Sequence, residues 1–289
     1  FSDYAWWIKT SSGLAGPGPN YFSDSTNNVW VDAAGCLHLR ITHRDGKWQC
    51  AEIISARTFG YGQYRFTVSA PVNSLDPSAV LGLFTWSNDS AYNDREIDVE
   101  LGRWNKASDT NCAQFAVQPA GSGQLQRFPV PAAVTNSTYT FTWQQGRADF
   151  QAMCGDFSPA PAAADVLRTW TCRLGVPPAG GENIRFNLWL NKGNAPTDGQ
   201  EIEVVISRFE FVPLGSPQPA QIKSLNWLDG GTMIGLLGQA DRRYEISSSS
   251  NLLDWVRIDR VLATNDSFQV VDTEPKAADL RSYRATTEP

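Results

Sequence analysis

Hydrophobic and polar residues alternate along most of this 289-residue chain. The period of two is clear at 37–41 (LHLRI) and 64–68 (YRFTV), and Gly, Pro, Asn and Asp separate such runs. A period of two gives a strand one apolar face, and no segment shows a long helical period. The RDG run at 44–46 predicts the turn of a hairpin. The pattern as a whole predicts an all-β sandwich.

A composition change divides the chain. Residues 213–220 (PLGSPQPA) are rich in Pro and have no hydrophobic period, which predicts a semi-rigid linker over 214–220. Residues 1–213 form the large domain that precedes it. Residues 221–289 contain further alternating runs, at 242–250, 255–263, 268–272 and 281–286, and these predict a second, smaller β-sandwich.

The most informative run is Glu96-Ile97-Asp98-Val99-Glu100. On a strand, the three acids share one face and the two apolar residues share the other. Like charges this close push their pKa values apart, as a site that needs one ionised and one protonated carboxyl requires. The alternative is a solvated edge face, but strands are poor in Asp and Glu and the neighbouring segments are aromatic.

The EIDVE run resembles the catalytic strand of glycoside hydrolase family 16, in the form found in bacterial lichenases. Four more segments resemble that family in its order and near its spacing: FGYGQYRFTV at 59–68, LFTW at 83–86, TYTFTWQQG at 138–146 and IRFNLWLNKG at 184–193. The resemblance implies a concanavalin A-like jelly-roll sandwich. It also implies a secreted, retaining endo-β-glucanase that cuts β-1,3- or β-1,4-linked glucan. The C-terminal segment resembles small fibronectin-like modules of bacterial secreted hydrolases, with a spacer role or, through Trp227 or Trp255, a sugar-binding one.

The resemblance also implies roles for the acids. Glu96 corresponds to the nucleophile, Glu100 to the general acid and base, and Asp98 to a carboxyl that hydrogen-bonds Glu96 and controls its protonation. Retaining glycosidases place their two carboxyls about 5–5.5 Å apart. We expect hydrogen bonds to keep the pKa of Glu96 low, and the two neighbouring negative charges to raise the pKa of Glu100.

The family's sugar contacts have counterparts here. The expected substrate-binding residues are Glu52, Phe84, Trp86, Gln114, Gln118, Asn187 and Trp189, with Tyr92 and Trp104 as replacement stacking surface on flanking loops. For Phe84 and Trp189 the alternative is core packing.

Several positions depart from the family pattern. Ile54 stands where the family has Arg, Ala116 where it has Asn, Gln118 where it has Tyr and Asp94 where it has Trp. Because these positions lie beside the catalytic centre, we expect the specificity to differ from that of a lichenase.

Composition narrows the class of partner. The chain has 24 Lys and Arg against 30 Asp and Glu, a net charge of −6, which disfavours nucleic acid or an anionic membrane as partner. Its 11 Trp residues suit a polysaccharide, because aromatic faces stack on pyranose rings. The chain has no apolar run of 18 residues, so we expect no membrane span. The chain begins at Phe1 without a signal peptide, so we interpret it as a mature or trimmed protein, and we expect a monomer.

The five cysteines form no C-x-x-C pair and there are only two histidines, which argues against zinc. An odd number of cysteines in a secreted protein suggests two disulfides and one thiol. Cys154 and Cys172 flank a loop and form the favoured pair, with Cys36–Cys50 as a second. We expect no cofactor. Ser207 replaces the family's calcium-binding Asp, although backbone carbonyls could supply most ligands of a structural calcium.

Two other functions fit the same scaffold. One is a non-catalytic polysaccharide-binding module, which the three adjacent acids argue against, since a lectin does not need them. The other is a transglycosylase, which uses the same two Glu residues but passes the glycosyl group to a sugar. The sequence does not separate hydrolysis from transfer.

Overall fold

The computed structural model describes residues 1–289 except 215–219, 239–242, 264, 275–280 and 288–289. The chain divides into two compact units, Phe1–Leu214 and Gly215–Pro289. Most of the predicted Pro-rich linker, residues 215–219, lies outside the described residues.

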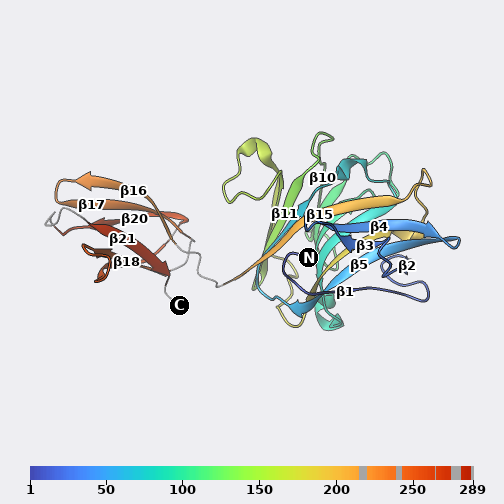
Figure 1. Ribbon diagram of the computed structural model, residues 1–289, viewed down its shortest axis with the longest axis horizontal. Coiled ribbons are helices and arrows are strands. Elements are labelled where there is room, and N and C mark those ends of the chain that lie inside the picture. Colours follow the sequence, from blue (N-terminus) through green and yellow to red (C-terminus); the bar gives the residue numbers. More distant parts are fainter. Residues whose placement is uncertain (215–219, 239–242, 264, 275–280, 288–289) are drawn as a thin grey trace. The chain divides into compact units, whose positions relative to one another are not determined.

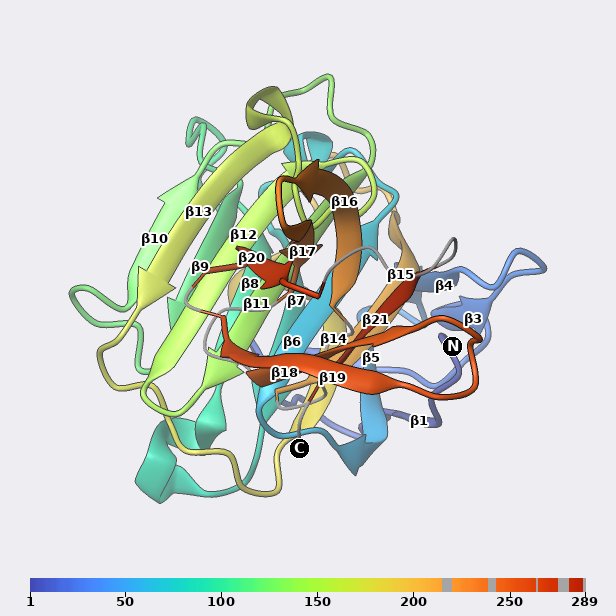
Figure 2. The same ribbon diagram turned by 90° about the vertical axis from the view of Figure 1, so that its left-hand side faces the viewer.

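The first unit is one continuous β-sheet that folds over into two layers (Figures 1 and 2). In order, the strands of the first layer are β10 (Leu125–Phe128), β9 (Ala113–Val117), β8 (Ile97–Gly102), β7 (Ala79–Trp86), β14 (Asn183–Leu190) and β5 (Lys47–Thr58), with β1 (Trp6–Ile8) and β2 (Tyr21–Phe22) paired to β5. The second layer continues through β4 (Leu37–Arg44), β15 (Ile202–Pro213), β6 (Gly62–Val68), β11 (Ser137–Gln144), β12 (Arg147–Cys154) and β13 (Val166–Cys172), with β3 (Val29–Val31) paired to β4. Four short 3₁₀ turns connect strands: η1 (Val72–Ser74), η2 (Ser90–Arg95), η3 (Ala163–Asp165) and η4 (Asn191–Gly193).

The core lies between the two layers and is rich in aromatic rings. Phe115 of the first layer stacks on Phe150 of the second with ring centroids 4.9 Å apart, and Phe66 meets Phe186 edge-on at 5.6 Å. All four rings are buried, and each buried side chain of this size contributes about 1.5–3 kcal/mol of hydrophobic stabilisation. The predicted all-β jelly-roll sandwich is confirmed.

The predicted hairpin turn joins β4 to β5. Arg44 pairs with Lys47, and the two residues between them, Asp45 and Gly46, have φ values of 52° and 68°. Two-residue hairpin turns of this kind need left-handed backbone at both central positions, which favours an Asp-Gly sequence.

The Cys154–Cys172 disulfide prediction is wrong. In the β12–β13 pair, Cys172 lies opposite Ala148, whereas Cys154 ends β12 six residues further on. Six residues of strand span about 20 Å, while a disulfide requires alpha carbons about 4.4–6.8 Å apart. Both thiols are free.

The alternative Cys36–Cys50 pair is wrong for the same reason. Gln49 of β5 lies opposite Thr42 of β4, and Cys36 precedes Thr42 by six residues. Hairpin register therefore keeps the two thiols far apart although they are close in sequence. Cys36, Cys50 and Cys112 are free.

The described residues of the second unit form two three-stranded antiparallel sheets. One contains β16 (Gln221–Leu228), β17 (Gly231–Leu237) and β20 (Ser267–Asp272), and the other contains β19 (Val256–Leu262), β18 (Arg243–Ser249) and β21 (Ser282–Thr287). A small core is centred on Ile234, Tyr244 and Ile246. Trp227 is 64% exposed, whereas Trp255 is half-buried under the guanidinium of Arg284. The fibronectin-like assignment stays a prediction.

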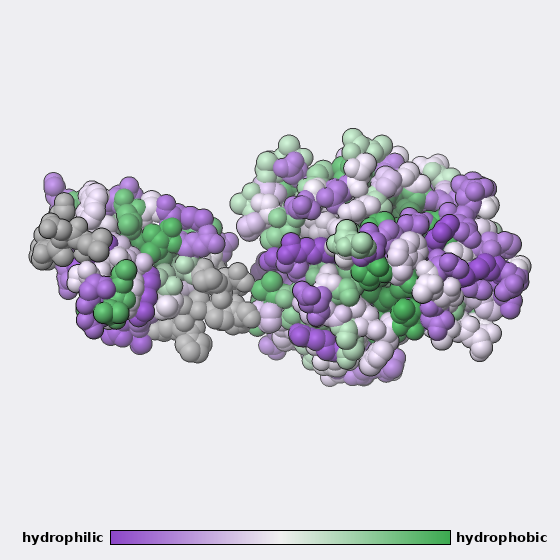
Figure 3. Space-filling view, viewed as in Figure 1, coloured by the Kyte–Doolittle hydropathy of each residue, from purple (hydrophilic) through white to green (hydrophobic). Residues whose placement is uncertain are grey.

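Hydrophobic residues also gather on the face of the first unit that carries β1 and β3 (Figure 3). They line a hollow of about 270 Å³ whose aromatic walls include Phe1, Trp6 and Trp30. The ring of Trp30 stacks on His38, with ring centroids 4.5 Å apart.

The imidazole of His38 forms two ion pairs whose contribution to the stability of the second layer can be tested. Its Nδ1 lies 2.9 Å from Glu203 and its Nε2 3.1 Å from Asp32. Burial lowers the pKa of His38, but the hydrogen bonds and charges of Glu203 and Asp32 outweigh this and raise the pKa above 6.5. A raised pKa means that the ion pairs stabilise the fold fully below pH about 6.5 and are lost as pH rises through the folded-state pKa.

We therefore predict that His38→Asn lowers the midpoint of denaturant unfolding more at pH 5.5 than at pH 9. Chemical denaturation at the two pH values measures the difference. An equal loss at both would show that the imidazole acts only by packing on Trp30.

The division into units gives a second test. All strands of the sandwich, including β15, end before residue 215. We predict that a chain cut after Leu214 unfolds in one cooperative transition, with a midpoint close to that of the sandwich in the full chain. Calorimetry of both proteins measures it, and loss of cooperativity on truncation would show that the second unit is needed for the sandwich to fold.

Candidate active site

The three predicted acids share the outer face of one strand. Asn93 and Asp94, with φ values of 49° and 56°, turn the chain at the end of η2, and Glu96 follows immediately before β8. Ile97 and Val99 point into the core and are fully buried. Because faces alternate along a strand, Glu96, Asp98 and Glu100 point away from the core.

These acids form part of the wall of a cleft of about 410 Å³. The predicted residues that line it are Glu52, Phe84, Trp86, Glu96, Asp98, Glu100, Asn187 and Trp189. Lys9, Gly16, Pro17, Gly82, Asn88 and Arg185 complete the lining. The cleft therefore combines carboxylates with aromatic rings, and Trp189 also packs against the core beneath it.

One row of the sheet crosses the cleft floor. Strand register places these residues side by side along it: Glu52, Asn187, Gly82, Glu100 and Gln114. A Cβ at position 82 would stand 2.5 Å from Oδ1 of Asn187, so the Asn187 side chain would have to shift to admit it. The glycine therefore leaves the floor open between Asn187 and Glu100.

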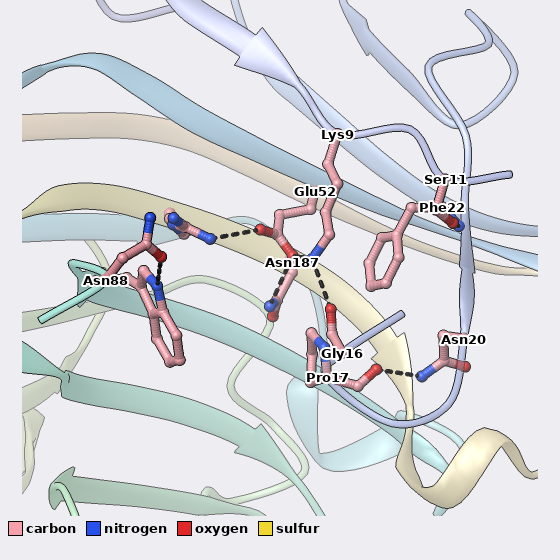
Figure 4. A network of polar contacts seen from close by, with 11 residues as sticks. Lys9, Ser11, Gly16, Pro17, Asn20, Phe22, Glu52, Asn88 and Asn187 are labelled. Atoms are coloured by element: carbon pink, nitrogen blue, oxygen red, sulfur yellow. Dashed lines mark hydrogen bonds and ion pairs between the residues drawn. The ribbon is translucent and has the colours of Figure 1, made fainter. Parts of the chain in front are cut away.

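Glu52 is held at one end of this row by two cations (Figure 4). Its carboxylate is 1% exposed and lies 2.9 Å from Nζ of Lys9 and 3.5 Å from the guanidinium of Arg185. Lys9 also donates to the carbonyl of Gly16 at 2.6 Å, which ties the 9–20 loop to the cleft rim. A buried carboxylate needs such partners to offset its lost hydration.

Lys9 and Arg185 were not predicted from the sequence. Arg185 alternates with Asn187 and Trp189 on β14, so a period of two could have identified it. It lies directly opposite Ile54, the position where the resembling family has Arg, and thus brings a guanidinium from the neighbouring strand. Lys9 had no such signal, since only the pairing of β1 with β5 brings it near Glu52.

Burial controls the charge of the acids. It raises the pKa of Glu96 to about 7, helped by the charge of Glu100 and opposed by a hydrogen bond from Asp98 and by Arg185. Burial and the charges of both Glu residues raise the pKa of Asp98 well above its usual value. The hydrogen bond with Glu96 also raises the pKa of Asp98, as it does when Asp98 is the protonated donor.

The expectation of a low pKa at Glu96 is wrong, because the cost of burying its charge exceeds the gain from its hydrogen bond. For Glu100 the expected direction is correct. The main cause is burial, with Gln114 and Arg127 acting to lower its pKa.

Gln114 and Gln118 hold the acids and do not line the cleft. Nε2 of Gln118 donates to Asp98 at 2.9 Å, and Nε2 of Gln114 donates to Glu100. Gln118 stands where the resembling family has Tyr, and in this chain the glutamine amide contacts a carboxyl of the site.

Tyr92 and Trp104 lie outside the cleft lining. Tyr92 is 44% exposed on η2, with the guanidinium of Arg95 over its ring at 4.3 Å. Trp104 follows β8 in a turn and carries the guanidinium of Arg127 at 4.4 Å. The structure does not bring these two rings to the other predicted sugar contacts.

Within the described ranges, no three His, Cys, Asp or Glu side chains are grouped so as to hold a metal ion. The hydroxyl of Ser207, at the family's calcium position, donates to the carbonyl of Thr67 at 3.3 Å. The same part of the chain has no helix with the length and hydrophobicity to cross a membrane.

Comparison with known proteins supports the fold. A beta-glucanase of Bacillus amyloliquefaciens is 28% identical over 173 residues, 58% of this chain and 64% of that protein. The chain thus spans less than two thirds of that relative. No family model matches.

Solved structures share the sandwich. The Bacillus licheniformis beta-glucanase has a TM-score of 0.54 at 19% identity, over 74% of this chain and 94% of that one. A glycoside hydrolase family 16 endo-glucanase from Bacteroides ovatus has a TM-score of 0.52 at 16% identity, over 73% and 96%. At these identities the likeness establishes the fold.

The raised pKa of Glu96 predicts a gain in stability when its charge is removed. The folded chain keeps a proton on Glu96 up to pH about 7, whereas the unfolded chain releases it near 4.5. The wild-type protein therefore loses stability as pH rises through this window. We predict that Glu96→Gln unfolds at higher denaturant than wild type at pH 8, and at a similar concentration at pH 4.

Glu210→Gln is the matched control. Glu210 lies 2.6 Å from Arg208 on the second layer, so its replacement removes an ion pair and gives no gain at pH 8. If Glu96→Gln were no more stable than wild type at pH 8, the buried carboxylate would not carry the cost assigned to it.

Proposed function

We propose that this chain is a retaining endo-β-glucanase of the glycoside hydrolase family 16 type, which hydrolyses β-1,3- or β-1,4-linked glucan. The observation that carries the proposal is the set of three acids, Glu96, Asp98 and Glu100. They are buried to different degrees on one strand face, and they line a cleft that also has aromatic walls. The beta-glucanase relatives support the same substrate class.

The proposed reaction has two steps. The ionised Glu96 attacks the anomeric carbon while Glu100 gives its proton to the departing glycosidic oxygen, so that one sugar is left bonded to Glu96. Water then attacks the anomeric carbon, Glu100 takes the proton of the water, and the bond from that carbon to Glu96 breaks so that Glu96 leaves as carboxylate. The roles of the two residues are carried from the family resemblance.

The partners of the two carboxyls differ. Asp98 hydrogen-bonds Glu96 and lowers its pKa, although burial raises that pKa to about 7, and burial also raises the pKa of Glu100. The proposed attack by Glu96 therefore needs a pH near or above about 7, where this carboxyl ionises.

Substrate binding is assigned to the rest of the cleft. Phe84, Trp86 and Trp189 offer ring faces, and Glu52 and Asn187 offer hydrogen bonds to hydroxyl groups. Ala116 lies opposite Asp98 on β9 and adds no polar group there. We therefore propose weaker turnover of mixed-linkage glucan than that of lichenases.

We also propose that the protein acts outside the cell. A glucan polymer is too large to cross a membrane, so its hydrolase must be exported to reach it. The free cysteines neither require nor oppose this location.

The function is tested by incubating the protein with a panel of β-glucans, with a galactan and xyloglucan as controls, and analysing products by mass. We predict internal cleavage of a β-glucan with retained configuration, and loss of at least about 99.9% of the rate in Glu96→Ala, in line with removal of a nucleophile. Added azide should restore turnover of an activated aryl glycoside and yield a glycosyl azide of inverted configuration.

Each other outcome has a meaning. Products longer than the substrate would identify a transglycosylase. Binding without products would identify a non-catalytic module. Substantial activity in Glu96→Ala without azide would refute its role as nucleophile.

A further inference from the structure

Arg127 forms a fixed link between the protein surface and Glu100. It lies on β10 directly opposite Gln114, which itself lies opposite Glu100. Its guanidinium donates to Oε1 of Gln114 at 2.9 Å, to Asp109 at 3.0 Å and to the carbonyl of Asn111 at 2.7 Å.

The ring of Trp104 closes one side of this guanidinium, 4.4 Å from it. Arg127 is 25% exposed and Asp109 21% exposed. A planar group with donors on both edges and a ring on one face has little freedom to turn. The position of the guanidinium is therefore set without any contact to Glu100 itself.

This link decides which way the Gln114 amide points. A glutamine amide can present either its oxygen or its nitrogen to a neighbour. A guanidinium can only donate hydrogen bonds, so the amide oxygen must face Arg127. The amide nitrogen is then left facing Glu100, to which it donates.

We propose that Arg127 is a positioning residue for Glu100: it orients the Gln114 amide so that the amide stabilises the ionised form of the Glu100 carboxylate. The inference rests on the proposed role of Glu100 as acid and base. In the second step of that reaction, Glu100 must be ionised to take a proton from water, although its burial favours the protonated form. The oriented amide keeps the ionised form within reach.

The surrounding charges leave this role to Arg127. Glu96 and Asp98 share the strand face of Glu100, but the charge of Glu96 repels that of Glu100, and the hydrogen bond of Asp98 is made to Glu96. Gly82, on the strand at its other side, carries no side chain. Among the described groups that affect the pKa of Glu100, Gln114 and Arg127 are those that lower it.

The test is a titration of Glu100 in the full chain. Carbon-13 NMR of labelled glutamate carboxyls follows the titration, and Glu100→Gln assigns the signal. We expect Arg127→Met to raise the midpoint of Glu100 by on the order of one pH unit, as loss of a hydrogen bond and a nearby charge should. Arg127→Lys can still donate to Gln114, so the midpoint of Glu100 in this variant should lie between those of the wild type and Arg127→Met.

Arg40→Met is the matched control. It removes an arginine paired at 2.7 Å with Glu201 in the second layer, so the charge change is the same and the midpoint of Glu100 should stay at the wild-type value. Gln114→Met is the second variant, because it removes the amide and leaves Arg127 on Asp109. It should raise the midpoint even if Arg127→Met does not fold.

Activity gives the second readout. With a glucan that the wild type cleaves, the alkaline limb of kcat/KM should move to higher pH in Arg127→Met, by the same shift as the NMR midpoint. A folded Arg127→Met or Gln114→Met protein with an unmoved Glu100 midpoint would overturn the inference. A moved midpoint in a protein that cleaves no glucan would instead refute the proposed function and leave the positioning role standing.

Discussion

The period of two along β8 is the constraint on which the rest of the site depends. Ile97, Val99 and Leu101 enter the core between the layers and are fully buried, and their hydrophobic burial holds the strand in register. A slip of one residue would place the carboxyls in that core, where uncompensated charges are very costly. The packing that stabilises the sandwich thus also fixes the side on which Asp98 and Glu100 lie.

Neighbouring strands then determine what these carboxyls do. Gln118 and Gln114 on β9 each donate to one acid, and Arg185 on β14 acts on Glu96 from the other side. Burial raises all three pKa values, and the individual partners set how far each rises. Acids that are alike in sequence therefore become chemically distinct through their neighbours across the sheet.

The two ends of the cleft floor are built in a similar way. At one end, Glu52 is buried between Lys9 and Arg185. At the other end, Glu100 is reached from Arg127 through Gln114. In both cases a cation at the rim offsets part of the cost of burying a negative charge.

Local alternation was enough to predict the sandwich, the Asp45-Gly46 hairpin and the shared face of the three acids, because strand periodicity is a property of the chain itself. The cysteine pairing failed, since hairpin register separates Cys154 from Cys172. The pKa of Glu96 and the contacts of Lys9 and Arg127 also required the tertiary structure. Burial depth and partners from distant strands exist only once the sheet is assembled, and no local pattern in the sequence encodes which strands become neighbours.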